Sequence, residues 1–377
     1  MRSRRFIWIL ALAAVLVAGC CIEPPLHLRR VVTTKVTTKV DLDLRWQLNW
    51  TAKWDFNWSV ATSDPLGYSV PTTMRLHIYT QGPDGTPVSH MVHNFVGSES
   101  QMDVFVGTHN FLFHNNDSEA ILFQADGDLE PVHAYTRKVS SGLKESSPVY
   151  TTSQKLAGFT KAGDEEEDPV AEPVNLMPDD LFSLYDPNQK ITDNPNDYIF
   201  ENGKYVLKIE GMLEPSTFIY LVQVNLLNNA GRVIGSAGGG ALTGMAEGVN
   251  LVTRETWSTT ASVFTDVYMD KAQDMMGVRF STFGIPGCNP YDDASVAAAP
   301  QKEHYFVLNV SYSNGSNRNI RMDITDQLRA LPLGGVINLE IDVNDFPPGE
   351  GGGSGGGGFN ALICGWDEEV GSTTIEY

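Results

Sequence analysis

The sequence contains no motif that marks a catalytic or a metal site. The 377-residue chain lacks the H-E-x-x-H, G-x-S-x-G and Walker patterns of metalloproteases, serine hydrolases and nucleotide-binding proteins. An enzyme can also assemble its catalytic groups in space, but no residue of this chain is singled out for such a role. We therefore predict a protein that is not an enzyme and that holds no cofactor and no metal.

Basic residues are scarce in the chain. It contains 26 Lys and Arg against 46 Asp and Glu, so its net charge is −20. A nucleic-acid-binding protein needs a basic surface, so this charge excludes nucleic acid as a partner. It also argues against electrostatic attachment to an anionic membrane surface.

Long hydrophobic runs are absent except at the start of the chain. Phe6–Ala18 is an apolar run of 13 residues that follows three arginines. This length is typical of a signal peptide and is too short for a membrane-spanning helix, which needs about 20 residues. No other stretch approaches that length, so we predict a signal peptide over residues 1–19 and no spanning segment.

The end of the apolar run, Val17-Ala18-Gly19-Cys20, resembles the lipobox of bacterial lipoproteins. The resemblance implies that the Cys20 thiol is acylated and that cleavage makes Cys20 the new N-terminus. Loss of residues 1–19 removes three arginines and no acidic residue, which leaves a net charge of −23. Two or three acyl chains would hold the protein to a membrane. The alternative is an ordinary secretory signal, and Cys21 fits the pattern less well than Cys20.

Cysteine is rare beyond the lipobox. Only Cys288 and Cys364 remain, and both would lie in an oxidising compartment. They form a disulfide if the fold brings their Cα atoms within about 6 Å, and otherwise they are two buried thiols. The sequence leaves both possibilities open.

The chain has the composition and the hydrophobic pattern of an all-β protein. It has 35 glycines and 20 prolines and shows no long helical period. Val31–Val40 is extended, and from Leu42 to Trp58 every even position is apolar, which predicts a strand with one apolar face and a break near Ala52. The four tryptophans of this stripe, at 46, 50, 54 and 58, indicate the inner face of a sandwich or, alternatively, a sugar-stacking surface.

Further strands and turns follow along the chain. We predict strands over Thr73–Thr80, Val88–Phe95, Met102–His114 (one or two), Ala120–Gln124, Tyr205–Glu210, Phe218–Leu227, His304–Ser313 and Ile337–Val343. Hairpin turns are predicted at Gln81–Gly85 and Asn314-Gly315, a small-residue loop from Gly238 to Gly248, and one short helix within Asp323–Leu331, capped by Thr325 or Asp326. This pattern predicts two β-sandwich domains, over residues 20–190 and 191–377.

Several polar clusters have structural explanations. Asp164–Asp168 lacks the ligand spacing of a known calcium loop and is more typical of a solvated loop. His90 and His93 are three residues apart, so on a strand they point to opposite faces and form a poor metal chelate. His109 and His114 lie close to them in sequence. Asp126-Gly127-Asp128 is typical of a turn. Residues 351–358 hold seven glycines and form a flexible joint or a plain loop before the terminal segment Phe359–Tyr377.

Several stretches resemble a family of Bacteroides-type lipoproteins related to fimbrial anchor proteins, within the fimbrillin superfamily. The matching residues are Pro25-Leu26 after the lipobox, Phe56–Ser59, Tyr79 with Pro83–Gly85, Gly107–Glu119, Ala241–Ala246 and Gly365–Asp367. The resemblance implies two transthyretin-like β-sandwich domains and a role in fimbriae or adhesion at the outer membrane. The chain departs from the family in its tether, where only Glu23 supplies the usual acidic export signal, so the membrane leaflet stays open.

These observations predict an outer-membrane lipoprotein that acts as an anchor or accessory subunit of a fimbria-like polymer. Its partners would be fimbrial subunits that bind by β-strand addition. The main alternative is a surface glycan-binding lipoprotein of a polysaccharide-uptake system, which would need exposed tryptophans. A purely structural role in the envelope is a third possibility.

Overall fold

The computed structural model describes residues 31–40, 55–60, 67–125, 129–139 and 172–348. Nearly all elements in these ranges are β-strands, which confirms the all-β prediction. The helices of the described ranges are short: η1 (Trp58–Val60), η2 (Pro195–Asp197), α5 (Asp293–Ala298) and α6 (Thr325–Arg329). None of the helices described there is long and apolar enough to cross a membrane.

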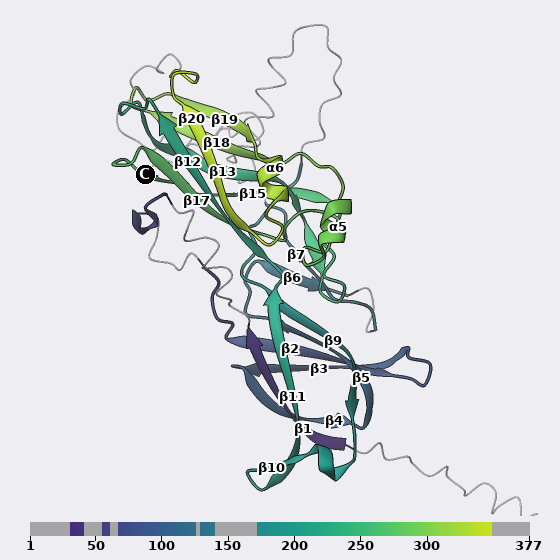
Figure 1. Cartoon of the computed structure of the whole chain (residues 1–377). Coiled ribbons are helices and arrows are strands. Elements are labelled where there is room, and N and C mark those ends of the chain that lie inside the picture. Colours follow the sequence, from purple (N-terminus) through teal and green to yellow (C-terminus); the bar gives the residue numbers. More distant parts are fainter. Residues whose placement is uncertain (1–30, 41–54, 61–66, 126–128, 140–171, 349–377) are drawn as a thin grey trace, which may run out of the picture.

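The first sheet holds the start of the described chain and forms the lower part of the molecule in Figure 1. Its strand order is β3-β2-β5-β9-β11-β1-β4, and β10 pairs with β11. The strands are β1 (Val31–Val40), β2 (Thr73–Gln81), β3 (Pro87–Val96), β4 (Glu99–Phe105), β5 (Gly107–Asn115), β9 (Phe182–Ile191), β10 (Ile199–Glu201) and β11 (Lys204–Pro215). β9 and β11 pair only at their ends, at Glu214 with Ser183 and Pro215 with Phe182, so the sheet turns a corner there.

The two halves of this sheet pack on a shared core. Its buried side chains come from both sides of the corner: Val36, Met74, Leu76, Ile78, Phe95, Val104, Phe111, Phe113, Phe182, Ile191, Ile209 and Leu213. Met74, Leu76 and Ile78 lie on one face of β2, as the alternating pattern predicts. A single curled sheet thus forms both layers of the first sandwich and encloses its core.

A small sheet covers the other face of β2, β5 and β9. It consists of β6 (Ile121–Gln124), β7 (His133–Thr136) and β14 (Gly248–Asn250). Its apolar residues pack with Tyr79 and Leu112 from the first sheet. This layer explains why β2 is buried on both faces in its second half and breaks strict alternation there.

The second sandwich lies in the upper part of Figure 1. One sheet has the order β16-β17-β12-β20 and the other β19-β18-β13-β15-β8. The strands are β8 (Val174–Asn175), β12 (Phe218–Leu227), β13 (Val233–Ala246), β15 (Thr260–Thr265), β16 (Tyr268–Asp270), β17 (Met275–Thr282), β18 (Tyr305–Tyr312), β19 (Asn317–Asp323) and β20 (Gly335–Asp342). Between them lies the largest core of the described chain, which includes Tyr220, Phe280, Phe306 and Tyr312.

The predicted loop from Gly238 to Gly248 is wrong, because β13 runs through most of it. The small residues serve close packing within the strand. A Cβ at Gly240 would lie 2.9 Å from both Phe306 and Val267, and Gly239 has φ +77° beside the Thr265 carbonyl. Register shifts follow Ser236 and Leu242, so this glycine-rich strand is irregular rather than absent.

Two further predictions need correction. The predicted helix near residue 325 exists, but its N-cap is Ile324, which makes no side-chain cap bond. Instead, Asp323 Oδ1 accepts a hydrogen bond from Thr325 N at 2.9 Å. The predicted strand does not reach Trp58, which begins the helical turn η1, while residues 41–54 lie outside the described ranges.

Sheet pairing crosses the predicted domain boundary at residues 190 and 191. β11 belongs to the first sheet and continues to Pro215, and only Ser216 and Thr217 separate it from β12 of the second sandwich. Two further pairs join strands from before and after this boundary: β7 pairs with β14, and β8 pairs with β15. The two sandwiches are therefore joined by several chain segments, and the division into two domains stays a prediction.

Candidate functional site

The strand that follows the predicted tether, β1, lies inside the first sheet. It pairs in parallel with β11, from Thr34 with Leu207 to Val40 with Leu213. On its other side it pairs antiparallel with β4, from Val31 with Phe105 to Thr37 with Glu99. The first described strand of the chain is therefore held by backbone ladders on both of its edges.

Side chains strengthen the hold on β1 at its centre. Lys35 Nζ lies 3.2 Å from Glu99 Oε2 and 3.5 Å from Glu201 Oε1, so it joins β1 to β4 and to β10. The hydrogen bond to Glu99 is the main reason that the pKa of Lys35 is raised, which keeps the amine charged at neutral pH. On the other face of β1, Thr34, Val36 and Thr38 are buried.

β1 begins at the end of the first sandwich that is remote from the second sandwich (Figure 1). Its last residue, Val40, lies opposite Leu213, close to where β11 leads into β12. A tether before Val31 would therefore attach at one end of the molecule, and the second sandwich would lie at the other end.

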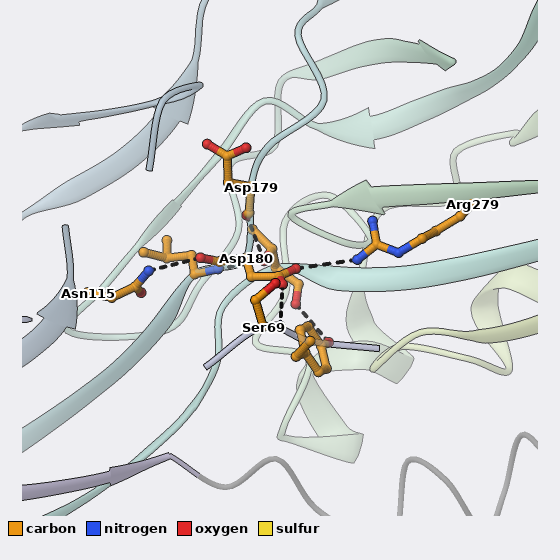
Figure 2. Close-up of polar contacts among 8 residues, drawn as sticks. Ser69, Asn115, Asp179, Asp180 and Arg279 are labelled. Carbon is orange, nitrogen blue, oxygen red and sulfur yellow. Dashed lines mark hydrogen bonds and ion pairs between the residues drawn. The ribbon is translucent and has the colours of Figure 1, made fainter. Parts of the chain in front are cut away.

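A polar cleft of about 570 Å³ lies between the two sandwiches. Its lining comes from the first sandwich, from the segment before β9 and from strands of the second sandwich. The acidic residues in this lining are Asp117, Glu119, Asp179, Asp180 and Asp266, and the basic one is Arg279. Figure 2 shows the centre of this arrangement around Asp180.

The two adjacent aspartates of the cleft bind groups from several elements. Asp180 Oδ2 accepts a hydrogen bond from Ser69 N at 2.7 Å, and its Oδ1 lies 3.5 Å from Arg279 Nη2 on β17 (Figure 2). Asp179 Oδ2 accepts hydrogen bonds from the Ser118 hydroxyl, Glu119 N and Ala120 N, at 2.7 to 2.8 Å. These carboxylates join segments of the chain.

Asp117 and Tyr68 complete this joint. Asp117 accepts hydrogen bonds from Thr72 N at 2.6 Å, from the Thr72 hydroxyl and from Asn115 Nδ2. Burial alone would raise the pKa of Asp117, but these hydrogen bonds outweigh burial and lower the pKa. The Tyr68 hydroxyl donates a hydrogen bond to the carbonyl of Thr217, which lies between β11 and β12. Burial raises the pKa of Tyr68 well above its usual value. The arrangement is that of a polar joint between segments of the chain.

Three histidines form a hydrogen-bonded row under the small sheet. His77 Nδ1 lies 3.0 Å from His90 Nε2, and His77 Nε2 lies 3.1 Å from His114 Nε2. His114 Nδ1 is 2.7 Å from the Asn115 carbonyl, which can only accept, so Nδ1 carries the proton. In the neutral row, His77 Nε2 then donates to His114, and His90 donates to His77. The described residues contain no group of three or more ligands suited to a metal ion.

The predicted site residues are only partly within the described ranges. Cys20, Cys364, the acidic run at 164–168, Asp126–Asp128, the glycine-rich joint at 351–358 and most of the tryptophan stripe lie outside them. Cys288 is fully buried, its pKa is raised by burial, and it forms no disulfide within the described ranges. Lipidation of Cys20 and a disulfide between Cys288 and Cys364 therefore stay predictions.

The described end of the tryptophan stripe is a packing element. Phe56 and Trp58 are 4% and 8% exposed and cover Ile219, Leu221 and Val336 on the outer face of the second sandwich. Phe56 N and Asp55 N donate to Gln223 Oε1. This part of the stripe is buried against protein, but on the outer face of the second sandwich and not on the predicted inner face of a strand.

His90 and His93 lie on opposite faces of β3, as their spacing predicts. His90 contacts His77, whereas His93 Nε2 lies 2.8 Å from the Ser100 hydroxyl. The sequence analysis missed His77, Asp180 and Arg279. Their partners are remote in sequence, and only the strand register and the return of the chain bring them together.

Comparisons with known proteins were made by family, by sequence and by structure. The model of a family described as a domain of unknown function, DUF5119, matches residues 41–266. A search of curated proteins finds none that matches.

Three solved structures are similar to the chain. One is a provisionally named adhesin from Bacteroides ovatus, with 14% identity, a TM-score of 0.46 and coverage of 83% of this chain and 93% of that one. A provisionally named polysaccharide-binding protein from Bacteroides thetaiotaomicron has 7% identity, a TM-score of 0.45 and coverage of 82% and 91%. The fimbrial anchor protein Mfa2 from Porphyromonas gingivalis has 10% identity, a TM-score of 0.40 and coverage of 82% and 91%.

Proposed function

The chain belongs to the DUF5119 family, and we propose that it is a non-enzymatic lipoprotein of the outer membrane. In this proposal it is attached through acyl chains on Cys20 and serves as an anchor or accessory subunit of a fimbria-like polymer. The lipobox and the sequence resemblance to fimbrial anchor lipoproteins support this function. The cleft supports it too, because the carboxylates of Asp117, Asp179 and Asp180 bind chain segments of the protein itself.

The position of β1 carries the proposal. An anchor must transmit tension from its membrane tether into the folded protein. Only 10 residues separate Cys20 from Val31, where β1 begins, and β1 is paired on both edges. Tension along the strand loads its hydrogen bonds to β4 and β11 at the same time, so they must break together. A strand at a sheet edge would have only one such ladder.

We propose that the polymer binds by β-strand addition at β3. Among the described residues, β3 is a ten-residue edge strand with a partner only on the β2 side. It has no lysine or arginine, its proline is its first residue, and Val88, Val92 and Val96 are 51%, 45% and 79% exposed. A long apolar edge of this kind is the type that pairs with another chain. The fitting partner is an extended segment of a neighbouring subunit.

A deletion strain tests the function. Cells that lack the protein should shed the polymer into the medium or build it at altered length, and the intact gene should restore attachment. Normally attached polymer of normal length, together with impaired growth on a polysaccharide, would instead support the glycan-binding alternative.

The β3 edge has its own test. Val92→Lys should weaken co-purification of the polymer subunit, because an edge lysine opposes strand pairing. Val70→Lys is the control, since Val70 is 68% exposed and lies outside the strands. Equal co-purification with both variants would exclude β3 as the docking edge.

A further inference from the structure

The end of the described chain lies against the sheet that contains β19. After β20, the Tyr312 hydroxyl of β18 donates to the Phe346 carbonyl. Arg318 of β19 donates to the Pro347 carbonyl at 3.2 Å, and its guanidinium lies 5.4 Å from the centre of the Phe346 ring. The chain has therefore crossed from β20 to the start of β19 when it reaches Pro348.

β19 is the last strand of its sheet in the described part of the chain. It pairs with β18 over its whole length, from Asn317 with Ser311 to Asp323 with Tyr305. On its other side, no described strand is paired with it. An edge of this kind offers backbone groups to a further strand.

Charge distinguishes β19 from the other edge strands. Among the described strands at sheet edges, only β19 contains lysine or arginine, namely Arg318 and Arg321. The Arg321 guanidinium lies 3.5 Å from the centre of the Tyr305 ring, which holds it on the sheet surface. The C-terminal segment Phe359–Tyr377 has four acidic residues and no basic one. Opposite charges on neighbouring strands stabilise their pairing.

We propose that Phe359–Tyr377 of the same chain adds to the outer edge of β19 as a further strand. The intervening residues 349–358 are mainly glycine, and ten such residues span about 17–19 Å on average. This distance is comparable to the length of β19, about 23 Å for seven residues. A short glycine-rich connection of this kind gives the segment an effective concentration of the order of millimolar at the edge. The inference does not depend on the proposed function.

The neighbouring edge, β20, is less suited to this segment. The Gln327 side chain of α6 already binds its backbone at Asn338: Nε2 donates to the Asn338 carbonyl at 3.1 Å, and Oε1 accepts from Asn338 N at 3.2 Å. These are the two bonds that an added strand would make there. β20 also carries Glu340 and Asp342, which repel an acidic segment.

Hydrogen–deuterium exchange of β19 tests the proposal. In the full-length protein, amides of residues 317–323 should exchange at least tenfold more slowly than in a protein that ends at Pro348. A full-length variant with Arg318→Glu and Arg321→Glu should exchange as fast as the truncated protein. Asp367→Lys, Glu368→Lys and Glu369→Lys, added to that variant, should restore protection. The control combines Lys271→Glu with Lys302→Glu, two exposed positions outside β19, and should match the wild type.

Two outcomes would overturn the inference. One is equal exchange of residues 317–323 with and without the terminal segment, in proteins whose β12 amides show the same protection and which are therefore folded. The other is protection that disappears on dilution, with a dimer in light scattering, because the segment would then come from a second copy. Protection that is independent of concentration in a monomer supports the assignment to the same chain.

Discussion

Three histidines, His77, His90 and His114, share a row of hydrogen bonds on the face of the first sheet that the small sheet covers. Burial, and then repulsion from the other two histidines, lowers the pKa of His77 to about 3, and burial lowers that of His114 to about 4. Arg75 lowers both further, and Phe123 packs on His114. His77 and His114 are therefore neutral at pH 7.

This row predicts a loss of stability in weak acid. Below pH 6.5 the unfolded chain binds protons at His77 and His114 while the folded chain does not, so the unfolded state gains stability relative to the folded state as pH falls. Each of the two histidines should lower the free energy of unfolding by about 1.4 kcal/mol per pH unit until its folded pKa is reached. Urea unfolding at pH 7 and pH 5 measures this change.

An NMR titration provides the matching control. The imidazole resonances of His77 and His114 should stay constant from pH 8 to pH 5, with assignments made from His77→Gln and His114→Gln. Ordinary titration of both resonances near pH 6.5 would contradict the buried neutral row.

Gly277 and Phe56 form a contact that allows no side chain on the glycine. A Cβ at Gly277 would lie 2.5 Å from the Phe56 ring. Gly277→Ala should therefore destabilise the protein by about 1–3 kcal/mol, and Phe56→Ala by about 3–5 kcal/mol. The double variant should lose less than the sum of the two, because the clash disappears with the ring.

The control for this cycle is Gly235→Ala, since nothing lies within 4 Å of a Cβ there. Its melting temperature should equal or exceed that of the wild type. Strict additivity of the Gly277 and Phe56 substitutions would show that the two residues do not pack together.

At the scale of elements, β1 is the strand on which the proposed attachment depends. Lys35→Glu places a third carboxylate beside Glu99 and Glu201, so amides of residues 31–38 should exchange faster with deuterium. Lys39→Glu is the matched control, because Lys39 lies 3.9 Å from Glu210 and both are mostly exposed. If the two variants exchange alike, Lys35 does not hold β1 in the sheet.

Strands with strong alternation were predictable from the sequence. The predictions for β2, β12 and β18 agree with the structure to within one or two residues, because an apolar run or an alternating pattern ends at a clear turn in each of them. β13 was missed because glycine and alanine carry little pattern, although they are needed where Phe306 and Val267 pack closely. The cap of α6 was missed because Asp323 binds Thr325 N from one position before the N-cap.

The joint between the sandwiches was beyond sequence reasoning. Asp180 and Arg279 are 99 residues apart, and no local spacing indicates their contact. The histidine row depends on the register of β2 with β3 and β5, which a single sequence does not fix. The period of two marked Phe56 and Trp58 as apolar positions, but they are buried from an irregular segment and a helical turn rather than from the predicted strand.

At the scale of the whole molecule, the elements form one path from the predicted tether to the far end. β1 pairs with β11, Ser216 and Thr217 join β11 to β12, and the polar joint around Asp180 connects the two sandwiches (Figures 1 and 2). In the proposed anchor, tension would follow this path. The second sandwich lies at the end opposite the start of β1. This arrangement suits a protein that holds a polymer away from a membrane.

The central claim is that Cys20 links the polymer to the membrane, and one measurement tests it most directly. The chromosomal gene is replaced with Cys20→Ala or with the control Cys21→Ala, and the polymer is quantified on cells and in the medium. The account predicts that Cys20→Ala abolishes labelling by radioactive palmitate and releases the polymer, while Cys21→Ala leaves both as in the wild type. Continued palmitate labelling of the Cys20→Ala protein, or polymer that stays on those cells, would contradict it.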